Sequence, residues 1–167
     1  MSNSTSIQMM TNCAIRKAHP DEADTLSQLA RRSKAYWGYS DTFMAACEAE
    51  LNYTASQIET EQLQFMVMQR KERCIGFYAL ERITSTTFSL EALFVEPRYI
   101  GQGYGRALME HAKTNARRQG ASTLRIQGDP NAQRFYLAAG AKIVGRKESD
   151  SIPGRFLPLF SLALTNK

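Results

Sequence analysis

Apolar and polar side chains divide the segment 86–95 into the two faces of a β-strand. One face would carry Phe88, Leu90, Ala92 and Phe94, and the other would carry Ser89, Glu91, Leu93 and Val95. Because successive side chains of a strand point to opposite faces, this spacing predicts a long strand near the middle of the chain. Further strands are expected at 14–18, 64–68, 75–80, 123–127, 142–145 and 156–164.

Helical spacing of apolar residues marks the segments between these strands. Helices are expected over 21–35, about 43–51, about 105–119 and 129–140. Asp21 would cap the first of them, and Asp129 would cap the last with Pro130 in its first turn. No repeat or linker interrupts the pattern. It predicts a flexible polar leader over residues 1–12 and one α+β domain with a mixed sheet over residues 13–167.

The charge of the chain is positive but scattered. The formal net charge is +5, and no stripe of Lys, Arg and aromatic residues gathers as a nucleic-acid footprint would require. The first dozen residues are too polar for a signal peptide, and no apolar run approaches the length that spans a bilayer. A cytoplasmic protein with neither a nucleic-acid partner nor a membrane attachment is therefore expected.

The residues that bind metals in proteins are few. Cys13, Cys47 and Cys74 are widely spaced and form no CxxC pair, and His19 and His111 are the only histidines. This pattern favours reduced thiols over a disulfide framework, and it predicts no metal site.

Three glycines at alternate positions, Gly101, Gly103 and Gly105, separate the long central strand from the helix that follows. Backbone N–H groups can converge on an anion where a glycine-rich turn leads into a helix N-terminus, whose partial charge is positive. No Gly-Lys-Ser/Thr follows, which argues against a P-loop. The Gly-x-Gly-x-Gly spacing and its position past the middle of the chain argue against a Rossmann dinucleotide site.

Two motifs then resemble those of the GNAT N-acetyltransferases. Val95-x-Pro97 followed by Gly101-Gln102-Gly103-Tyr104-Gly105-x-x-Leu108 looks like the acyl-CoA-binding motif of this family. Asp129-Pro130-Asn131-Ala132-x-x-Phe135-Tyr136-x-x-x-Gly140-Ala141 is similar to its second CoA segment. The resemblance covers roughly residues 13–165. It implies a mostly antiparallel central sheet of six to seven strands flanked by helices, with acetyl-CoA as cofactor.

The resemblance also implies roles for individual residues. The backbone of Phe94 and Val95 would bind the pantetheine arm, and Asn131 and Phe135 would contact the same arm. Tyr136 would protonate the departing thiolate, although a core aromatic residue is the other interpretation of this position. The pyrophosphate would be held by Gln102, Gly103, Tyr104, Gly105 and Arg106. The family pattern usually opens this loop with Arg or Gln, where this chain has Ile100, so Arg98 or Gln102 would have to substitute.

A base and an acceptor wall are also expected. Glu91 lies at a strand position where some family members place a basic catalytic group, and apolar neighbours would desolvate its carboxylate, which suits a base. A solvent-facing or salt-bridged Glu91 is an equally good interpretation. Trp37 and Tyr39 fall in a loop between helices where the family builds its acceptor wall, but they could instead form a loop-anchoring aromatic cluster.

These expectations combine into one predicted activity. The chain would transfer an acetyl group from acetyl-CoA to a primary amine, by direct attack in a ternary complex. The acceptor would be a small-molecule amine or a peptide amine. An acyl-CoA-binding module with this fold but no transferase activity is the alternative, and a nucleic-acid-binding domain is a weaker one. A homodimer is a reasonable expectation for a small domain of this kind.

Overall fold

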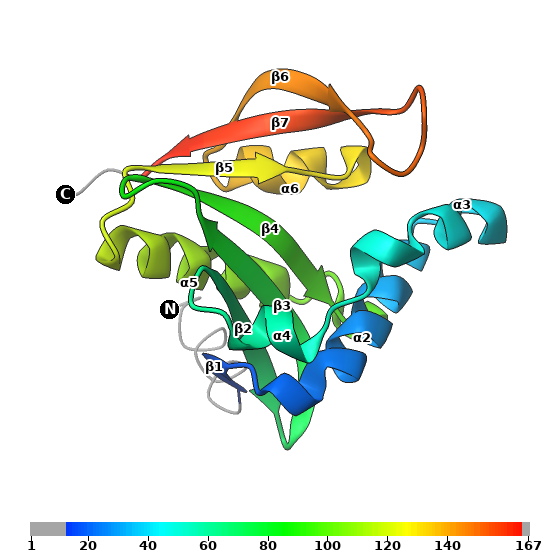
Figure 1. Cartoon of the computed structure of the whole chain (residues 1–167), viewed down its shortest axis with the longest axis horizontal. Coiled ribbons are helices and arrows are strands. Elements are labelled where there is room, and N and C mark those ends of the chain that lie inside the picture. The colour runs from blue at the N-terminus through cyan, green and yellow to red at the C-terminus, as the bar shows by residue number, and fades with distance from the viewer. Residues whose placement is uncertain (1–12, 165–167) are drawn as a thin grey trace.

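The computed structural model describes residues 13–164, and the leader predicted over 1–12 lies outside the described residues. Within them, seven strands form one sheet in the order β1-β2-β3-β4-β5-β7-β6 (Figure 1). All neighbouring strands are antiparallel except β4 and β5, which are parallel. The strands are β1 (Cys13–Lys17), β2 (Leu63–Arg70), β3 (Arg73–Arg82), β4 (Thr87–Val95), β5 (Thr123–Gln127), β6 (Lys142–Glu148) and β7 (Phe156–Ala163).

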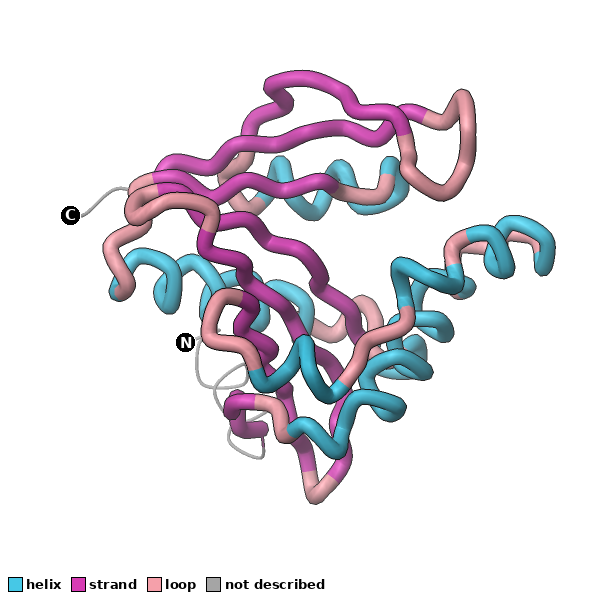
Figure 2. The backbone as a smooth tube through the Cα atoms, in the orientation of Figure 1, coloured by secondary structure: helices cyan, strands magenta, loops and turns pink. Residues whose placement is uncertain are grey.

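Helices cover both faces of this sheet (Figure 2). Helix α5 packs on β3 and β4 from one side, whereas α2 packs on the same strands from the other side and α4 packs on β2. The α-helices are α2 (Ala23–Ala35), α3 (Asp41–Ala46), α4 (Ala55–Glu59), α5 (Tyr104–Arg118) and α6 (Gln133–Ala138). Short 3-10 helices are η1 (Pro20–Glu22), η2 (Glu48–Leu51), η3 (Pro97–Tyr99) and η4 (Pro130–Ala132).

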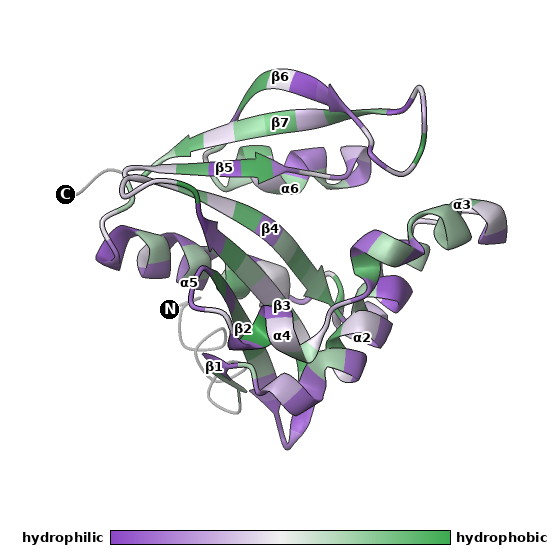
Figure 3. Cartoon of the chain, in the orientation of Figure 1, coloured by the Kyte–Doolittle hydropathy of each residue, from purple (hydrophilic) through white to green (hydrophobic). Residues whose placement is uncertain are grey.

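Two apolar cores lie on the two faces of the sheet, where hydrophobic residues gather along the strands (Figure 3). The first core, on the α5 side, includes Leu108 and Phe160. The second core, under α2, includes Leu26, Phe65 and Phe77. Burying apolar side chains on both faces is what stabilises a sheet covered by helices on each side.

The two faces predicted for the central strand are wrong in detail, because β4 carries a bulge. Ala79 of β3 pairs with Ala92 and the next residue pairs with Leu90, so Glu91 has no partner in the ladder. Leu90 therefore packs in the first core with Val95, whereas Ala92 lies in the second core. An extra residue in one strand moves every side chain that follows it to the opposite face of the sheet. A prediction based on strict alternation along the sequence cannot anticipate this shift.

Most predicted elements are present with shifted ends. Asp21 does not cap the first long helix, because a 3-10 turn that starts after His19 precedes it. Asp129 does cap the turn that it begins, since its side chain accepts a hydrogen bond from the backbone N–H of Asn131. The helix expected over 43–51 consists of α3 and η2, and α4 was not predicted.

The parallel strands β4 and β5 pair only along their first halves. The last pair in register is Leu90 with Ile126, and beyond it the strands diverge, as Figure 1 shows. The residues of β4 from Glu91 to Val95 therefore lack a neighbouring strand on that side. No helix in the described part of the chain is both long and apolar enough to cross a membrane.

Candidate active site

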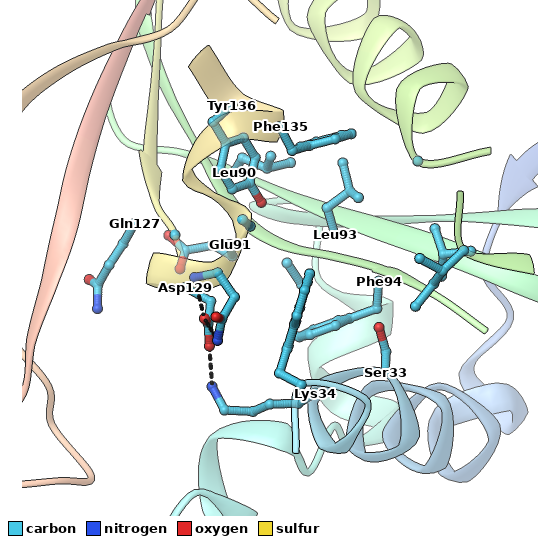
Figure 4. A pocket seen from close by; sticks show the side chains of 18 of the residues that line it. Ser33, Lys34, Leu90, Glu91, Leu93, Phe94, Gln127, Asp129, Phe135 and Tyr136 are labelled. Atoms are coloured by element: carbon cyan, nitrogen blue, oxygen red, sulfur yellow. Dashed lines mark hydrogen bonds and ion pairs between the residues drawn. The ribbon is translucent and has the colours of Figure 1, made fainter. Parts of the chain in front are cut away.

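A cavity of about 720 Å³ occupies the space where β4 and β5 diverge (Figure 4). This volume lies within the range of small-molecule and cofactor sites. Ten of the predicted site residues line it: Trp37, Glu91, Phe94, Val95, Gly103, Gly105, Arg106, Asn131, Phe135 and Tyr136. The fold thus brings three separate segments of the sequence to one cavity.

The open edge of β4 forms one wall of this cavity. All five residues from Glu91 to Val95 line it, and they are the residues that no strand pairs on the β5 side. Backbone N–H and C=O groups along such an edge can bind an extended molecule that carries amide groups, in the way that an added strand would. The wall is therefore suited to a pantetheine arm.

The N-terminus of α5 faces the same cavity. Its N-cap is Gly103, which has φ of 91° and supplies no side-chain hydrogen bond to the first turn. Only glycine adopts this backbone conformation readily, and an uncapped first turn leaves N–H groups free to bind an anion. Arg106, in that turn, also lines the cavity, and the turn contains no acidic residue. The residues present therefore fit a pyrophosphate.

Other predicted residues of the loop have different surroundings. The ring of Tyr104 is 2% exposed and packs edge-on against Tyr99 at 5.8 Å between centroids, so only its backbone is free to meet a phosphate. Gln102 donates a hydrogen bond to the carbonyl oxygen of Arg98 at 3.0 Å. Ile100 lines the cavity, whereas neither Arg98 nor Gln102 does. Arg106 is thus the basic side chain of this loop that reaches the cavity.

Tyr136 is buried in protein but borders the cavity. Its ring is 7% exposed and packs against Phe135 and Phe160, at 5.2 and 5.3 Å between centroids. Burial raises the pKa of Tyr136, and Asp129 adds to the effect. Among the described residues its hydroxyl makes no hydrogen bond, and Figure 4 shows that it points into the cavity. It can therefore donate a proton to a bound group.

Asp129 lies at the centre of a cluster beside the cavity, and Lys34, Asp129 and Asn131 of this cluster line it. This Asp129 cluster consists of Lys34, Tyr39, Asp129, Asn131 and Arg155. Tyr39 donates its hydroxyl hydrogen to the carboxylate, with oxygen–oxygen distances of 2.7 and 2.9 Å. The Arg155 guanidinium donates to the Tyr39 hydroxyl at 2.8 Å and to the carboxylate at 3.3 Å. The Lys34 ammonium lies 3.7 Å from the same carboxylate.

The cluster changes the interpretation of two predicted residues. Tyr39 stacks on Phe43 at 4.0 Å and does not line the cavity, so its side chain supports the wall from behind. Burial, together with the hydrogen bond to Asp129, raises the pKa of Tyr39 to about 12. Asn131 donates its side-chain amide to Tyr39 at 2.8 Å and to Asp129 at 3.0 Å. Its role toward the cofactor arm stays a prediction.

Glu91 and Trp37 lie at other parts of the cavity wall. Glu91 is exposed at the bulge, so the burial among apolar neighbours that we expected for it is absent. Its carboxyl group acts on Tyr53, which packs against the second core. The prediction that Glu91 shares a face with Val95 is wrong, because the bulge at Glu91 shifts the alternation of side chains along β4. Trp37 is 44% exposed and packs edge-on against Tyr36 at 5.7 Å.

Several lining residues escaped the sequence analysis. Lys34 lies in the last turn of α2, Glu50 lies in a 3-10 turn, and Gln127 ends β5, and none of them belongs to a motif. Asp129 was recognised as a helix cap and as the first residue of the second motif, but its ion pairs with Lys34 and Arg155 were not expected. The sequence offered no signal for these residues because their proximity depends on packing between distant elements.

Comparison with known proteins identifies the family. The profile of the Acetyltransferase (GNAT) domain matches residues 20–151. The chain is 32% identical over 154 residues to a peptidyl-lysine N-acetyltransferase, YjaB, of Salmonella typhimurium, with 92% of this chain and 98% of the relative covered. The protein of the same name from Escherichia coli is 28% identical, covering 90% and 95%. The chain therefore belongs to the GNAT family of acetyltransferases.

Solved structures support the fold. The PaiA N-acetyltransferase of Thermoplasma acidophilum, crystallised with coenzyme A, superimposes with a TM-score of 0.76 at 21% identity, covering 90% of this chain and 98% of that one. The family, the mostly antiparallel sheet and the acetyltransferase class expected from the sequence are thus confirmed.

Proposed function

We propose that this chain transfers the acetyl group of acetyl-CoA to a primary amine, and that the amine is the side chain of a peptide or protein lysine. The observation that carries the proposal is the cavity in which the open edge of β4 faces the N-terminus of α5. One wall suits the amides of pantetheine and the other suits a pyrophosphate. The names of the two curated relatives favour lysine as the acceptor.

The residues available favour direct attack in a ternary complex, which we include in the proposal. Bound acetyl-CoA would supply a thioester whose carbonyl carbon the amine attacks. The β4 edge would hold its pantetheine arm extended, and Phe135 would pack beside that arm. Holding both reactants in one geometry contributes much of the rate in such reactions. Cys47 is buried and does not line the cavity, so it is poorly placed for an acyl-enzyme.

Two side chains would handle protons. Tyr136, whose hydroxyl faces the cavity, would donate a proton to the departing thiolate. Glu91, from the β4 bulge, would accept a proton from the acceptor ammonium. Trp37 would form part of the acceptor wall, and Tyr39 would support that wall through Asp129.

The test is incubation of the purified protein with acetyl-CoA and a single-lysine peptide with blocked termini. We expect release of free thiol and a gain of one acetyl group on the peptide. A panel of small-molecule amines and free N-termini in the same assay would reveal another acceptor. Tight binding of coenzyme A without thiol release from any amine would favour the binding module instead. A cytoplasmic location and a homodimer stay predictions from the sequence.

A further inference from the structure

Ser33 lies on the apolar stripe of α2, at the point where this stripe leaves the core. Leu26, Leu29 and Ala30 pack in the second core, and Ser33 follows them at helical spacing. Ser33 lines the cavity, and so does Trp37, four residues further on. The face of α2 that packs on the sheet therefore ends in a polar side chain beside the site.

The Ser33 side chain is buried, yet its hydroxyl group has no partner. Ser33 is 8% exposed, and among the described residues its side chain makes no hydrogen bond. In the same part of the chain, the unpartnered side-chain atoms that are shut off from solvent belong to Arg31 and Arg70, so the Ser33 oxygen keeps access to the cavity. Figure 4 shows this oxygen pointing from α2 into the cavity, on the side of Phe94.

Another buried serine of the same helix shows how such a hydroxyl is usually satisfied. Ser27 donates a hydrogen bond to the carbonyl oxygen of Ala23 at 2.8 Å and accepts one from the backbone N–H of Tyr53 at 2.8 Å. Ser33 makes neither kind of bond, although it is nearly as buried. Because a buried polar group without a partner costs free energy, a hydroxyl in this state is available to a ligand.

The two neighbours of Ser33 fix its position. The Arg32 guanidinium donates hydrogen bonds of 2.8 and 2.7 Å to the carboxylate of Glu96, which directly follows β4. The Lys34 ammonium lies 3.7 Å from the carboxylate of Asp129, which lies just beyond β5. The last turn of α2 is thereby tied to the segments that follow both strands. A group held in this way loses little freedom when a ligand binds.

The pantetheine arm of acetyl-CoA has more polar groups than the β4 edge can satisfy. An amide chain that bonds to the edge of one strand directs alternate N–H and C=O groups away from that edge. From Glu91 to Val95, no strand on the β5 side of β4 is there to receive them. A serine hydroxyl can donate one hydrogen bond and also accept, so it suits either kind of group, and it suits the hydroxyl of the arm.

We propose that Ser33 is a cofactor-binding residue, whose hydroxyl group hydrogen-bonds the pantetheine arm of acetyl-CoA from the α2 side of the cavity. It adds to the backbone edge of β4 a side chain that no sequence motif marks. The inference rests on the cofactor site of the proposed function, and it holds for any acceptor amine.

The first experiment measures the affinity for coenzyme A by calorimetry. In Ser33→Ala the Kd should rise roughly fivefold to tenfold, because one hydrogen bond to the ligand is lost. The free energy of unfolding without ligand should not fall, since the hydroxyl has no partner to lose and alanine favours a helix. An unchanged Kd in this variant would overturn the proposal.

The matched control is Ser27→Ala, which makes the same substitution in the same helix. It should lower the free energy of unfolding, because the N–H group of Tyr53 loses its partner, and it should keep the Kd for coenzyme A. Ser27 does not line the cavity. The same rise of Kd in both variants would mean that disturbance of the helix, and not a lost contact, weakens binding, which contradicts the role of Ser33.

A second variant separates hydrogen bonding from shape. Ser33→Cys fills nearly the same space, but a thiol is a weak donor and a weak acceptor. We expect it to raise the Kd about as much as Ser33→Ala does. Full affinity in Ser33→Cys would show that the side chain acts by packing alone, and the proposal would then be wrong.

Two further measurements locate the contact on the arm. Adenosine 3′,5′-bisphosphate lacks the arm, so its affinity should be equal in the unmodified protein and in Ser33→Ala. With the blocked single-lysine peptide, Ser33→Ala should raise the KM for acetyl-CoA and leave kcat and the KM for the peptide unchanged. A loss of affinity for the bisphosphate, or a rise confined to the KM for the peptide, would assign Ser33 to another part of the site.

These readouts also separate Ser33 from the function on which the inference rests. If the unmodified protein does not bind coenzyme A, the proposed function fails and the role of Ser33 fails with it. If it binds coenzyme A but releases no thiol with any amine, the transferase function fails, while the Kd values still decide the role of Ser33. Thiol release with equal Kd values in the unmodified protein and Ser33→Ala would remove the role of Ser33 alone.

Discussion

The hydroxyl group of Tyr39 donates a hydrogen bond of 2.7 Å to the carboxylate of Asp129, a residue 90 positions away in the sequence. This bond joins the loop between α2 and α3 to the segment between β5 and α6, beside the cavity that Asp129 lines. Burial alone would raise the pKa of Asp129, but the hydrogen bond from Tyr39, together with Lys34 and Arg155, lowers it overall. The cluster thus keeps a half-buried carboxylate ionised.

Removal of this hydroxyl should loosen the cavity wall. Tyr39→Phe keeps the stacking on Phe43 but leaves Asp129, Asn131 and Arg155 each with one partner fewer. We expect the free energy of unfolding to fall by about 1–3 kcal/mol, measured by denaturant titration. The KM for the acceptor should rise more than the KM for acetyl-CoA. Tyr36→Phe, at a 54% exposed position, is the control and should change neither quantity.

Removal of the Tyr136 hydroxyl should affect chemistry rather than binding. In Tyr136→Phe the ring still packs against Phe135 and Phe160, so acetyl-CoA affinity measured by calorimetry should stay nearly unchanged. The kcat from thiol release should fall roughly a hundredfold, because general acid catalysis is lost. If kcat stays the same, Tyr136 is a packing residue only.

Gly128, which directly follows β5, has no room for a side chain. A Cβ atom there would lie 2.8 Å from the Tyr136 ring and 3.0 Å from the Phe160 ring. Gly128→Ala should therefore displace Tyr136, reduce kcat and lower stability by about 1–3 kcal/mol. Gly145→Ala is the matched control, since its Cβ would meet only Leu159, at 3.9 Å. Equal stability losses in the two variants would contradict this account.

Stability should also depend on the protonation of His111. Its Nδ1 atom lies 2.7 Å from the Tyr78 hydroxyl, which in turn accepts a hydrogen bond from Asn115. Burial lowers the pKa of His111, with Arg118 adding to the effect, so the folded state disfavours the charged ring. Between the folded and unfolded pKa values the unfolded chain binds more protons. Stability is therefore full above about pH 6.5 and declines as the pH falls below it.

Denaturation curves of the unmodified protein and of His111→Gln across pH 5 to 8 would test this. The variant should lose the part of the pH dependence that lies below the unfolded pKa of histidine. His19→Gln is the control, because His19 is exposed beside the first strand, and it should keep the slope of the unmodified protein. An unchanged slope in His111→Gln would show that another group is responsible.

Local pattern determined much of this protein. The glycines before α5 and the Asp129–Tyr136 segment were enough to indicate the family, because a phosphate-binding turn and a helix cap depend on residues close in sequence. Alternating and helical spacing located all seven strands and the long helices, since burial of one face repeats at fixed intervals.

Only the tertiary structure decided the details of the site. The bulge at Glu91 depends on how β4 aligns with β3, and this single unpaired residue places Leu90 and Ala92 on opposite faces of the sheet. The hydrogen bond from Tyr39 to Asp129 and the one from Arg155 to Tyr39 join residues that the sequence keeps apart. Strand register and the packing of distant elements set these distances, and neither is encoded in the periodicity of any one segment.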